Sequence, residues 1–366
     1  MFTNQNKNIY HNYFMNLALN QARINLGNTK LNPSVGCVLV KNNNLISAGS
    51  TNFNGRPHAE FNAINFSKNN VKNSDLYVTL EPCSHYGKTK PCVKTIIKKK
   101  IKRVFFSIND PDPRSFNRCK NILNQKGIIV RSNIMSNKIN NFYKSYLNFK
   151  NNLPFVTCKI AASKDFYTVN KNKKEWITNK FSRGRVHLMR STHDCLITSS
   201  KTIIDDNPRL TCRINGLNKR SPSRIILDRT LKIPINSKVV KEAHIFPTLV
   251  FYNKYNKKKI TLLKKFKVKT IKIPTDASGN LNLKIVLNKA LLLGHSRIFL
   301  ESGFTLIKSF LKKNLINDFQ LFISNTNLGN KGKKGIKNSL IILNKKNKYI
   351  NKVNLLGDKL ITYNLK

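Results

Sequence analysis

Apolar positions in the first part of the chain alternate between helical spacing and short unbroken runs. Residues 10–18 carry apolar side chains at the spacing of one helix face, which predicts an opening helix that stops near Gly27. The apolar runs 35–40 and 45–48 are joined by turn-prone residues and predict a β-hairpin. We expect further helices at 58–67, 92–100 and 118–125, and further strands at 76–80, 104–108 and 127–130. These elements predict a helix-covered sheet of about five strands.

The alternation restarts after a short polar break at 148–153. We therefore predict an α/β protein of two domains, 1–150 and 151–366, which agrees with a length of 366 residues. In the second domain we expect strands at 155–160, 195–198, 224–227, 248–252, 297–300 and 319–323, and helices at 180–190, 283–293 and 305–312. The lysine-rich segment 254–269 is expected to be a solvated insertion, and the runs 340–343 and 360–363 a closing strand pair.

The composition is that of a globular protein. Hydrophobic residues make up 40% of the chain, which is enough to form buried cores and excludes a disordered chain. No run approaches the roughly 18 consecutive apolar residues of a membrane span. The first twenty residues are polar and lack the apolar segment of a secretory signal. We expect a soluble, cytoplasmic protein with no membrane partner.

The chain is strongly basic. Lysine and arginine number 67 against 16 aspartate and glutamate, a net charge of +51, which invites a nucleic-acid interpretation. However, the chain is also rich in Asn, Ile and Phe, whose codons, like those of Lys, are rich in A and T. The lysines extend from Lys7 to Lys366 without forming one stripe. We therefore expect compositional drift and no nucleic-acid partner, with a polyanion-binding surface as the alternative.

Seven cysteines occur in a chain without an export signal, and an odd number argues against a disulfide framework. The cysteines are therefore expected either to be buried or to bind a metal. Cys37 lies within an apolar run and is expected to be a small buried hydrophobe. Only Cys83 and Cys92 have neighbours that suggest chemistry.

The strongest signal combines His58, Glu60, Cys83 and Cys92. One imidazole and two thiolates leave the fourth position of a tetrahedral zinc open for water, as in catalytic sites. Zinc lowers the pKa of its water to about 7 and so supplies a hydroxide nucleophile. A glutamate beside it can carry the proton to a ring nitrogen and the departing amine, as in nucleobase deaminases. Alternatives are a ligand role for His85, a structural zinc, and no metal.

Three segments, 32–40, 57–60 and 77–92, resemble the bifunctional deaminase-reductases of riboflavin biosynthesis. The long spacing from Cys83 to Cys92 separates that family from cytidine and transfer-RNA adenosine deaminases, whose spacing is short. The resemblance implies a cytidine-deaminase-like, three-layer domain that removes the 2-amino group of 2,5-diamino-6-ribosylamino-4(3H)-pyrimidinone 5′-phosphate. It also implies a homodimer. In this resemblance His58, Cys83 and Cys92 hold Zn²⁺, and Glu60 is the catalytic proton shuttle.

The second half contains no Gly-x-Gly-x-x-Gly fingerprint, so an ordinary Rossmann cofactor site is not expected. Arg190 and the segment 205–213 offer guanidinium groups of the kind that bind phosphate, although a solvated face has the same appearance. Gly303 is placed at a predicted helix N-terminus, where backbone N–H groups bind anions, although a plain strand-to-helix turn fits too.

The segments 176–178, 205–213 and 301–306, together with Arg190, are similar to the reductase domain of the same family. The resemblance implies a dihydrofolate-reductase-like fold in which NADPH reduces the ribosyl group to a ribityl chain. It places NADPH contacts at Ala161, Trp176, Thr202, Asp206, Gly303, Phe304, Thr305, Leu306 and Ile307. It places contacts to the phosphorylated pyrimidine at Lys174, Arg190, Leu210, Arg213 and Glu301.

The chain departs from the family pattern in several loops. Residues 114–119 lack two family glycines, and Phe166 replaces a glycine in the turn 163–166. Further changes lie at 173–175 and at Phe304. We expect an active reductase. The alternatives are a deaminase with a degraded reductase domain, a nucleic-acid base deaminase, and a zinc module without activity.

Overall fold

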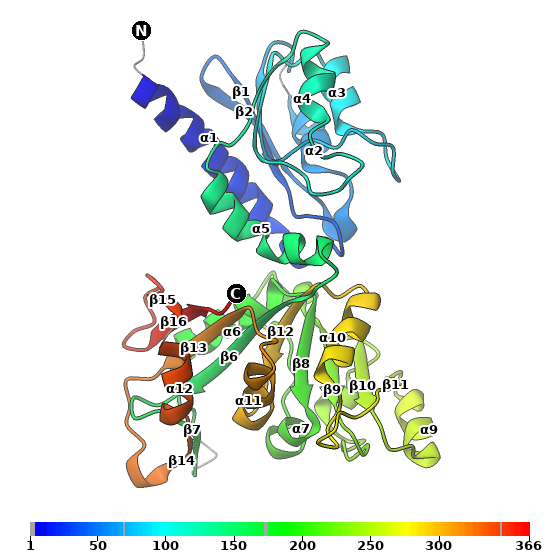
Figure 1. The fold of residues 1–366 in the computed structure, drawn as a ribbon, viewed down its shortest axis with the longest axis vertical. Helices are drawn as coiled ribbons and strands as arrows, with labels where there is room; N and C mark the ends of the chain where they lie inside the picture. Colours follow the sequence, from blue (N-terminus) through cyan, green and yellow to red (C-terminus); the bar gives the residue numbers. More distant parts are fainter. Residues whose placement is uncertain (1–3, 69, 172–174, 345) are drawn as a thin grey trace. The chain divides into compact units, whose positions relative to one another are not determined.

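The computed structural model describes residues 4–68, 70–171, 175–344 and 346–366. The chain divides into two compact units, and the division falls between Leu153 and Pro154 (Figure 1). Each unit is built on its own β-sheet, as expected for an α/β protein. Within the described residues, no helix is both long enough and apolar enough to span a bilayer.

The first unit contains a five-stranded sheet in the order β2-β1-β3-β4-β5. Strand β1 is antiparallel to both of its neighbours, and β3, β4 and β5 run parallel. The hairpin and the sheet predicted from the sequence are confirmed. The strands are β1 (Gly36–Lys41), β2 (Asn44–Ser50), β3 (Asp75–Leu80), β4 (Arg103–Ile108) and β5 (Ile129–Arg131).

Helices cover both faces of this sheet and complete three layers. Figure 1 shows α1 and α5 on one face and α2, α3 and α4 on the other. A Cβ on Gly36 would lie 1.9 Å from the Ala18 carbonyl of α1, and one on Gly49 would lie 2.5 Å from the Ala59 carbonyl of α2. Both helices therefore pack directly on β-strand backbone. The helices are α1 (Asn4–Ile24), α2 (Ala59–Phe66), α3 (Cys92–Lys98), α4 (Cys119–Asn124) and α5 (Ser136–Lys150), with a 3₁₀ turn at Phe53–Gly55.

The second unit contains a nine-stranded sheet in the order β11-β10-β9-β8-β12-β6-β13-β16-β15. The strands from β11 to β13 run parallel, and β16 is antiparallel to β13 and β15. The strands are β6 (Phe155–Ala162), β8 (Cys195–Ser199), β9 (Ser223–Leu227), β10 (Thr248–Tyr252), β11 (Lys269–Lys272), β12 (Arg297–Glu301), β13 (Asp318–Ile323), β15 (Asn347–Ile350) and β16 (Lys359–Asn364). A separate antiparallel pair joins β7 (Tyr167–Asn170) to β14 (Gly332–Gly335).

Two apolar cores lie on opposite faces of the larger sheet. Ile197 and Ile298 belong to one core and their strand neighbours Leu196 and Phe299 to the other, because successive side chains of a strand point to opposite faces. The helices are α6 (Lys180–Ser191), α7 (Ser200–Asp206), α8 (Lys238–Lys241), α9 (Lys257–Lys265), α10 (Leu283–Leu292), α11 (Phe304–Lys312) and α12 (Lys337–Asn344), with 3₁₀ turns at Asn218–Arg220 and Gly329–Lys331.

One predicted strand is a helix in the structure. Residues 340–343 lie within helix α12 instead of a strand, whereas 360–363 lie in β16 as predicted. A four-residue apolar run fits a buried helix turn as well as a strand, so its pattern does not decide between them. The lysine-rich segment 254–269 contains helix α9, whose Leu263 is buried while most of its lysines are exposed, so its solvated character is confirmed.

Candidate active sites

Three segments of the first unit bring His58, Cys83 and Cys92 together. His58 precedes the first turn of α2, Cys83 lies in the loop after β3, and Cys92 begins α3. His58 Nδ1 lies 3.5 Å from Cys83 Sγ and 3.4 Å from Cys92 Sγ. Ligands about 2.0 to 2.3 Å from a tetrahedral zinc lie about 3.3 to 3.8 Å apart, so the cluster has the dimensions of a zinc site. The sulfur and imidazole donors also suit this metal.

His85 does not belong to this cluster. The ligand atoms of His58, Cys83 and Cys92 all lie within 4.8 Å of one another, and within the described residues this group does not include His85. The Nδ1 atom of His85 instead makes a hydrogen bond of 2.8 Å with the Ser115 hydroxyl. The three-ligand arrangement therefore matches the catalytic type, which leaves one coordination position free.

Glu60 lies in the first turn of α2, two residues beyond His58, and only 3% of its surface is exposed. Burial raises the pKa of its carboxyl group to about 7, against the opposing effect of the His58 charge. A hydrogen bond from Cys92 is the largest cause of a low pKa for the Cys83 thiol, which favours the thiolate that binds a metal. Glu60 can thus gain and lose a proton near neutral pH, as a proton shuttle requires.

Glu81, which sequence reasoning missed, organises the loop next to the cluster. It follows β3 directly, and its carboxylate accepts backbone N–H groups of Asp110, Asn117 and Cys119 at 3.2, 3.1 and 3.0 Å. Asn117 has a φ of +57°, a conformation that asparagine tolerates better than most residues. The loop that lacks the family glycines is therefore closed through Asn117 and Glu81.

In the second unit, Glu301 at the end of β12 is held by two cations. Arg190 of α6 donates from Nε and Nη2 to its two carboxylate oxygens at 2.9 Å each. Lys159 Nζ of the adjacent strand β6 lies 3.8 Å from Oε1. Burial alone would raise the pKa of Glu301, but the charges of Arg190 and Lys159 lower it to about 2. Glu301 is therefore ionised at neutral pH. Sequence reasoning missed Lys159.

The loop 207–213 borders this ion cluster. The Thr211 carbonyl accepts a hydrogen bond of 3.0 Å from Arg190 Nη1. Leu210 is 3% exposed and has a φ of +58°. Burial and the charges of Arg190 and Arg209 lower the pKa of Arg213. The loop thus places cationic groups near one another, an arrangement suited to a phosphate.

The ends of β8 and β12 bring α7 and α11 together. Thr202 Oγ1 of α7 lies 3.1 Å from Ser302 Oγ and accepts the Gly303 N–H at 3.4 Å. Gly303 precedes the first turn of α11, as the sequence predicted. The N-terminus of a helix with free N–H groups favours an anion such as a pyrophosphate.

The other residues expected at the cofactor differ in exposure. Trp176 is 76% exposed, and the Arg183 guanidinium lies 5.3 Å from its ring centroid. The Ile307 side chain is fully buried in the core, which leaves only its backbone for a contact. Ala161 is half-buried on β6, Phe304 and Leu306 pack against the core, and Thr305 and Asp206 are exposed. Lys174 lies outside the described residues.

The turn 163–166 adopts a left-handed conformation at Phe166, the position where the family pattern has a glycine. Phe166 has a φ of +66°, which is unfavourable for a bulky residue. Its carbonyl accepts the Ile336 N–H at 3.0 Å. The Asp165 carboxylate accepts the N–H groups of Leu328 and Gly329. These contacts hold the turn in the conformation that glycine would adopt freely.

Two family models match the chain. Residues 9–108 match the cytidine and deoxycytidylate deaminase zinc-binding region, and residues 154–354 match the RibD C-terminal domain. The riboflavin biosynthesis protein RibD of Bacillus amyloliquefaciens is 34% identical over 85% of this chain and 84% of its own. The chain belongs to the RibD family. The RibD protein of Aquifex aeolicus is 32% identical over 96% of this chain and 97% of its own length.

Solved structures of RibD proteins share the whole fold. Acinetobacter baumannii RibD aligns with a TM-score of 0.82 and 26% identity, over 98% of this chain and 99% of its own. The Thermotoga maritima deaminase/reductase aligns with a TM-score of 0.82 and 25% identity over the same shares. The predicted family and fold classes are confirmed. As a RibD-family member the chain is a bifunctional enzyme of riboflavin biosynthesis, a deaminase and a reductase with zinc and NADPH as cofactors.

Proposed function

We propose that residues 1–150 deaminate 2,5-diamino-6-ribosylamino-4(3H)-pyrimidinone 5′-phosphate and that residues 151–366 reduce the ribosyl group of the product with NADPH. The observation that carries the deaminase assignment is the convergence of His58, Cys83 and Cys92 beside buried Glu60. The solved Thermotoga maritima relative is described as a diaminohydroxyphosphoribosylaminopyrimidine deaminase and 5-amino-6-(5-phosphoribosylamino)uracil reductase, which supports both substrates.

In the deaminase half, His58, Cys83 and Cys92 hold zinc, and Glu60 moves the proton. Zinc, when bound, supplies an activated water at neutral pH. The Glu60 carboxylate accepts one proton from the attacking water and donates it to the ring nitrogen, and it then carries the water's second proton to the departing amine, which leaves as ammonia. Its pKa of about 7 supports both directions of transfer.

In the reductase half, the ionised Glu301 and the cationic loop bind the phosphorylated substrate, and the α7–α11 junction binds NADPH. NADPH supplies the hydride, and the protein supplies placement and charge. Substrate contacts are assigned to Lys174, Arg190, Leu210, Arg213 and Glu301. Cofactor contacts are assigned to Ala161, Trp176, Thr202, Asp206, Gly303, Phe304, Thr305, Leu306 and Ile307. Lys159 joins the substrate group because it lies beside Glu301.

The test follows ammonia release and NADPH oxidation separately with the diaminopyrimidine phosphate as substrate. The proposal predicts ammonia release without NADPH, and NADPH oxidation only after deamination. Ammonia release without any oxidation would leave only the first half active and support a degraded reductase.

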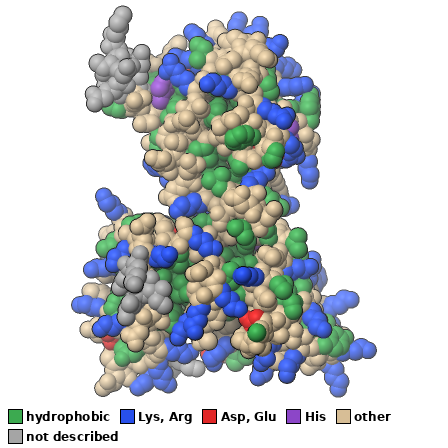
Figure 2. All heavy atoms as spheres, in the orientation of Figure 1, with side chains coloured by type: hydrophobic (Ala, Val, Ile, Leu, Met, Phe, Trp, Pro, Cys, Tyr) green, Lys and Arg blue, Asp and Glu red, His purple; other side chains and the backbone are tan. Residues whose placement is uncertain are grey.

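We assign the chain as a cytoplasmic homodimer without a nucleic-acid partner. On the face drawn in Figure 2, lysine and arginine side chains are spread over the described surface rather than gathered in one stripe, which supports a net charge without a polyanion site. Binding to nucleic acid would fall steeply with salt, so salt-insensitive turnover supports the small substrate. Light scattering of the purified chain tests the dimer.

A further inference from the structure

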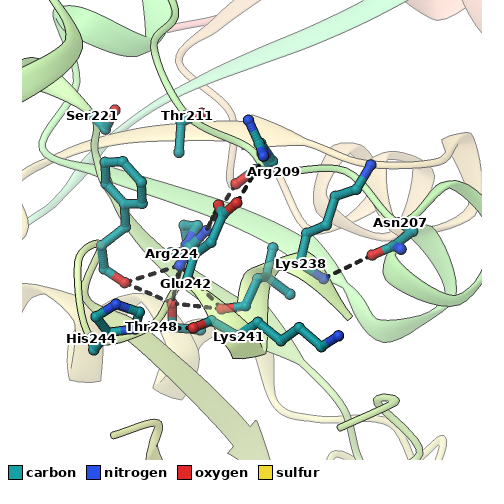
Figure 3. A network of polar contacts seen from close by, with 12 residues as sticks. Asn207, Arg209, Thr211, Ser221, Arg224, Lys238, Lys241, Glu242, His244 and Thr248 are labelled. Carbon is teal, nitrogen blue, oxygen red and sulfur yellow. Dashed lines mark hydrogen bonds and ion pairs between the residues drawn. The ribbon is translucent and has the colours of Figure 1, made fainter. Parts of the chain in front are cut away.

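Arg224 is a fully buried cation at the start of β9 (Figure 3). Its Nε and Nη2 atoms donate to the Thr248 hydroxyl at 3.0 and 2.7 Å. Nη2 also donates to the carbonyls of Val239 and Phe246 at 3.1 and 3.0 Å, and Nη1 donates to the Arg209 carbonyl at 2.9 Å. One guanidinium therefore ties three separate segments of the chain to each other.

Glu242 connects the same two arginines by its carboxylate. Its Oε1 atom lies 2.9 Å from Arg209 Nε, and its Oε2 atom lies 4.0 Å from Arg224 Nη1. The Oε2 atom is buried and makes no hydrogen bond within the described structure, so its position beside Arg224 is electrostatic. Arg209 is thus held twice, by its backbone carbonyl and by its side chain.

Arg209, which Arg224 and Glu242 hold in place, lies two residues before Thr211, which contacts the Arg190–Glu301 ion pair. Leu210 follows Arg209 in a left-handed conformation, with a φ of +58°. The next residue, Thr211, offers its carbonyl to Arg190 at 3.0 Å, and Arg190 holds Glu301. At the other end of the loop, the Asn207 side chain accepts the Lys238 N–H at 2.9 Å.

A buried arginine is an expensive way to stabilise a fold, because its desolvation offsets much of what its contacts contribute. Burial lowers the pKa of Arg224 to about 10, so the group still keeps its charge at neutral pH. What a guanidinium adds over an apolar side chain is direction, since its donors form a rigid planar fork. That fork fixes where the Arg209 carbonyl lies, and with it the path of the loop.

We infer that Arg224 and Glu242 are positioning residues that fix the loop 207–213, so that Leu210 and Arg213 meet the phosphorylated substrate of the reductase. Neither residue touches the substrate in this scheme. The inference rests on the proposed function, which assigns Leu210 and Arg213 as substrate contacts.

The test measures both activities of full-length R224K, E242Q and R224M. R224K keeps the charge but loses the planar fork, and E242Q keeps the shape but loses the charge. We expect the KM for 5-amino-6-(5-phosphoribosylamino)uracil to rise on the order of tenfold in E242Q and more in R224K, with kcat and the KM for NADPH within about twofold of the native values. R224M should be worse than R224K, because lysine retains some of the donors.

Deamination by the same chains is the internal control for expression and folding of the first unit. The matched surface control is K241Q, which removes an exposed charge next to Glu242 and should leave all constants unchanged. If R224M fails to fold, R224K and E242Q still test whether Arg224 and Glu242 position the loop.

A native substrate KM in both E242Q and R224K overturns the inference. So does an equal loss of kcat and of affinity for NADPH and substrate, because that pattern indicates a general structural role. R213Q separates this result from failure of the proposed function. If R213Q raises the substrate KM while E242Q and R224K do not, only the positioning role is lost. A native KM in R213Q contradicts the proposed substrate contact and removes the inference with it.

Discussion

Arg190 and Glu301, 111 residues apart in the chain, face each other through two parallel hydrogen bonds of 2.9 Å. The third guanidinium nitrogen of Arg190, Nη1, bonds to the Thr211 carbonyl at 3.0 Å. All three nitrogens are therefore engaged, and Arg190 holds both the carboxylate and the loop that borders it. The proposed substrate site of the reductase is organised around this pair, with Lys159 as a second cation.

Replacing Arg190 by methionine should destabilise the second unit. R190M leaves the Glu301 charge with only the more distant Lys159, and breaking a buried ion pair costs about 3–5 kcal/mol. Urea denaturation measures the loss. The double variant R190M/E301Q should recover part of the stability, because no unpaired carboxylate remains, but neither variant should oxidise NADPH. A double variant no more stable than R190M would argue against the pair as the cause.

The pH dependence of stability should show a contribution from His187. Burial and the charges of Arg190 and Arg213 lower the pKa of His187 to about 4, below its ordinary value of 6.5. The unfolded chain therefore takes up this proton first as pH falls, so the stabilising contribution is complete above pH 6.5 and is lost between about pH 6.5 and 4. The urea midpoint should fall between pH 7.5 and 5, and H187Q should reduce that fall.

Glu301 contributes to the pH dependence of stability in a lower pH range. Its pKa of about 2 lies below the ordinary 4.5, so its contribution is present above pH 4.5 and is lost as pH falls from there toward 2. The two pH windows barely overlap, so the contributions of His187 and Glu301 to stability can be measured separately. An H187Q variant with the native midpoint shift between pH 7.5 and 5 would contradict the assignment to His187.

Removal of the metal should separate the two activities. A chelator strong enough to strip zinc should abolish ammonia release, whereas NADPH oxidation with 5-amino-6-(5-phosphoribosylamino)uracil should continue. C92A should behave in the same way, because it removes one of three ligands. The measurement is metal content by elemental analysis beside both assays. Persistent deamination in the stripped protein would exclude the zinc mechanism.

Two glycines should respond to alanine in opposite directions. In G36A the new Cβ would lie 1.9 Å from the Ala18 carbonyl, and overpacking of this kind costs about 1–3 kcal/mol or more. Gly184 lies within helix α6, and among the described residues a Cβ there would meet nothing within 4 Å beyond the neighbouring turns of its own helix, so G184A should stabilise by up to about 1 kcal/mol. Thermal unfolding of both variants checks the signs. Destabilisation by G184A would contradict the open space around a Cβ at this position.

The elements that the sequence predicts well are those with clear periodicity. The hairpin β1–β2 and the strands that follow alternate with turn-rich segments, so their pattern has one interpretation. The sequence pattern does not predict helix α5, and it favours a strand for the run 340–343, which lies in α12. In both cases the pattern lacks a decisive signal, since packing against the rest of the unit determines the structure.

The two sites also differ in how well local sequence predicts them. His58, Glu60, Cys83 and Cys92 lie within 35 positions in short motifs, so local sequence predicts their chemistry. The Arg190–Glu301 pair joins distant elements, and no spacing rule reveals it. Lys159 had one available signal, a charged residue within the strand Phe155–Ala162, whose other residues are apolar except Thr157. Glu81 had none beyond its position before Pro82 and Cys83.

In the proposed mechanism, Glu60 moves the proton at a zinc site made by His58, Cys83 and Cys92. The most direct test is E60Q, assayed for ammonia release, bound zinc and NADPH oxidation. We expect zinc at the native level, deamination reduced by about 10²–10⁴-fold, and unchanged reduction of 5-amino-6-(5-phosphoribosylamino)uracil. Native deamination by zinc-loaded E60Q, or loss of zinc together with the activity, would contradict it.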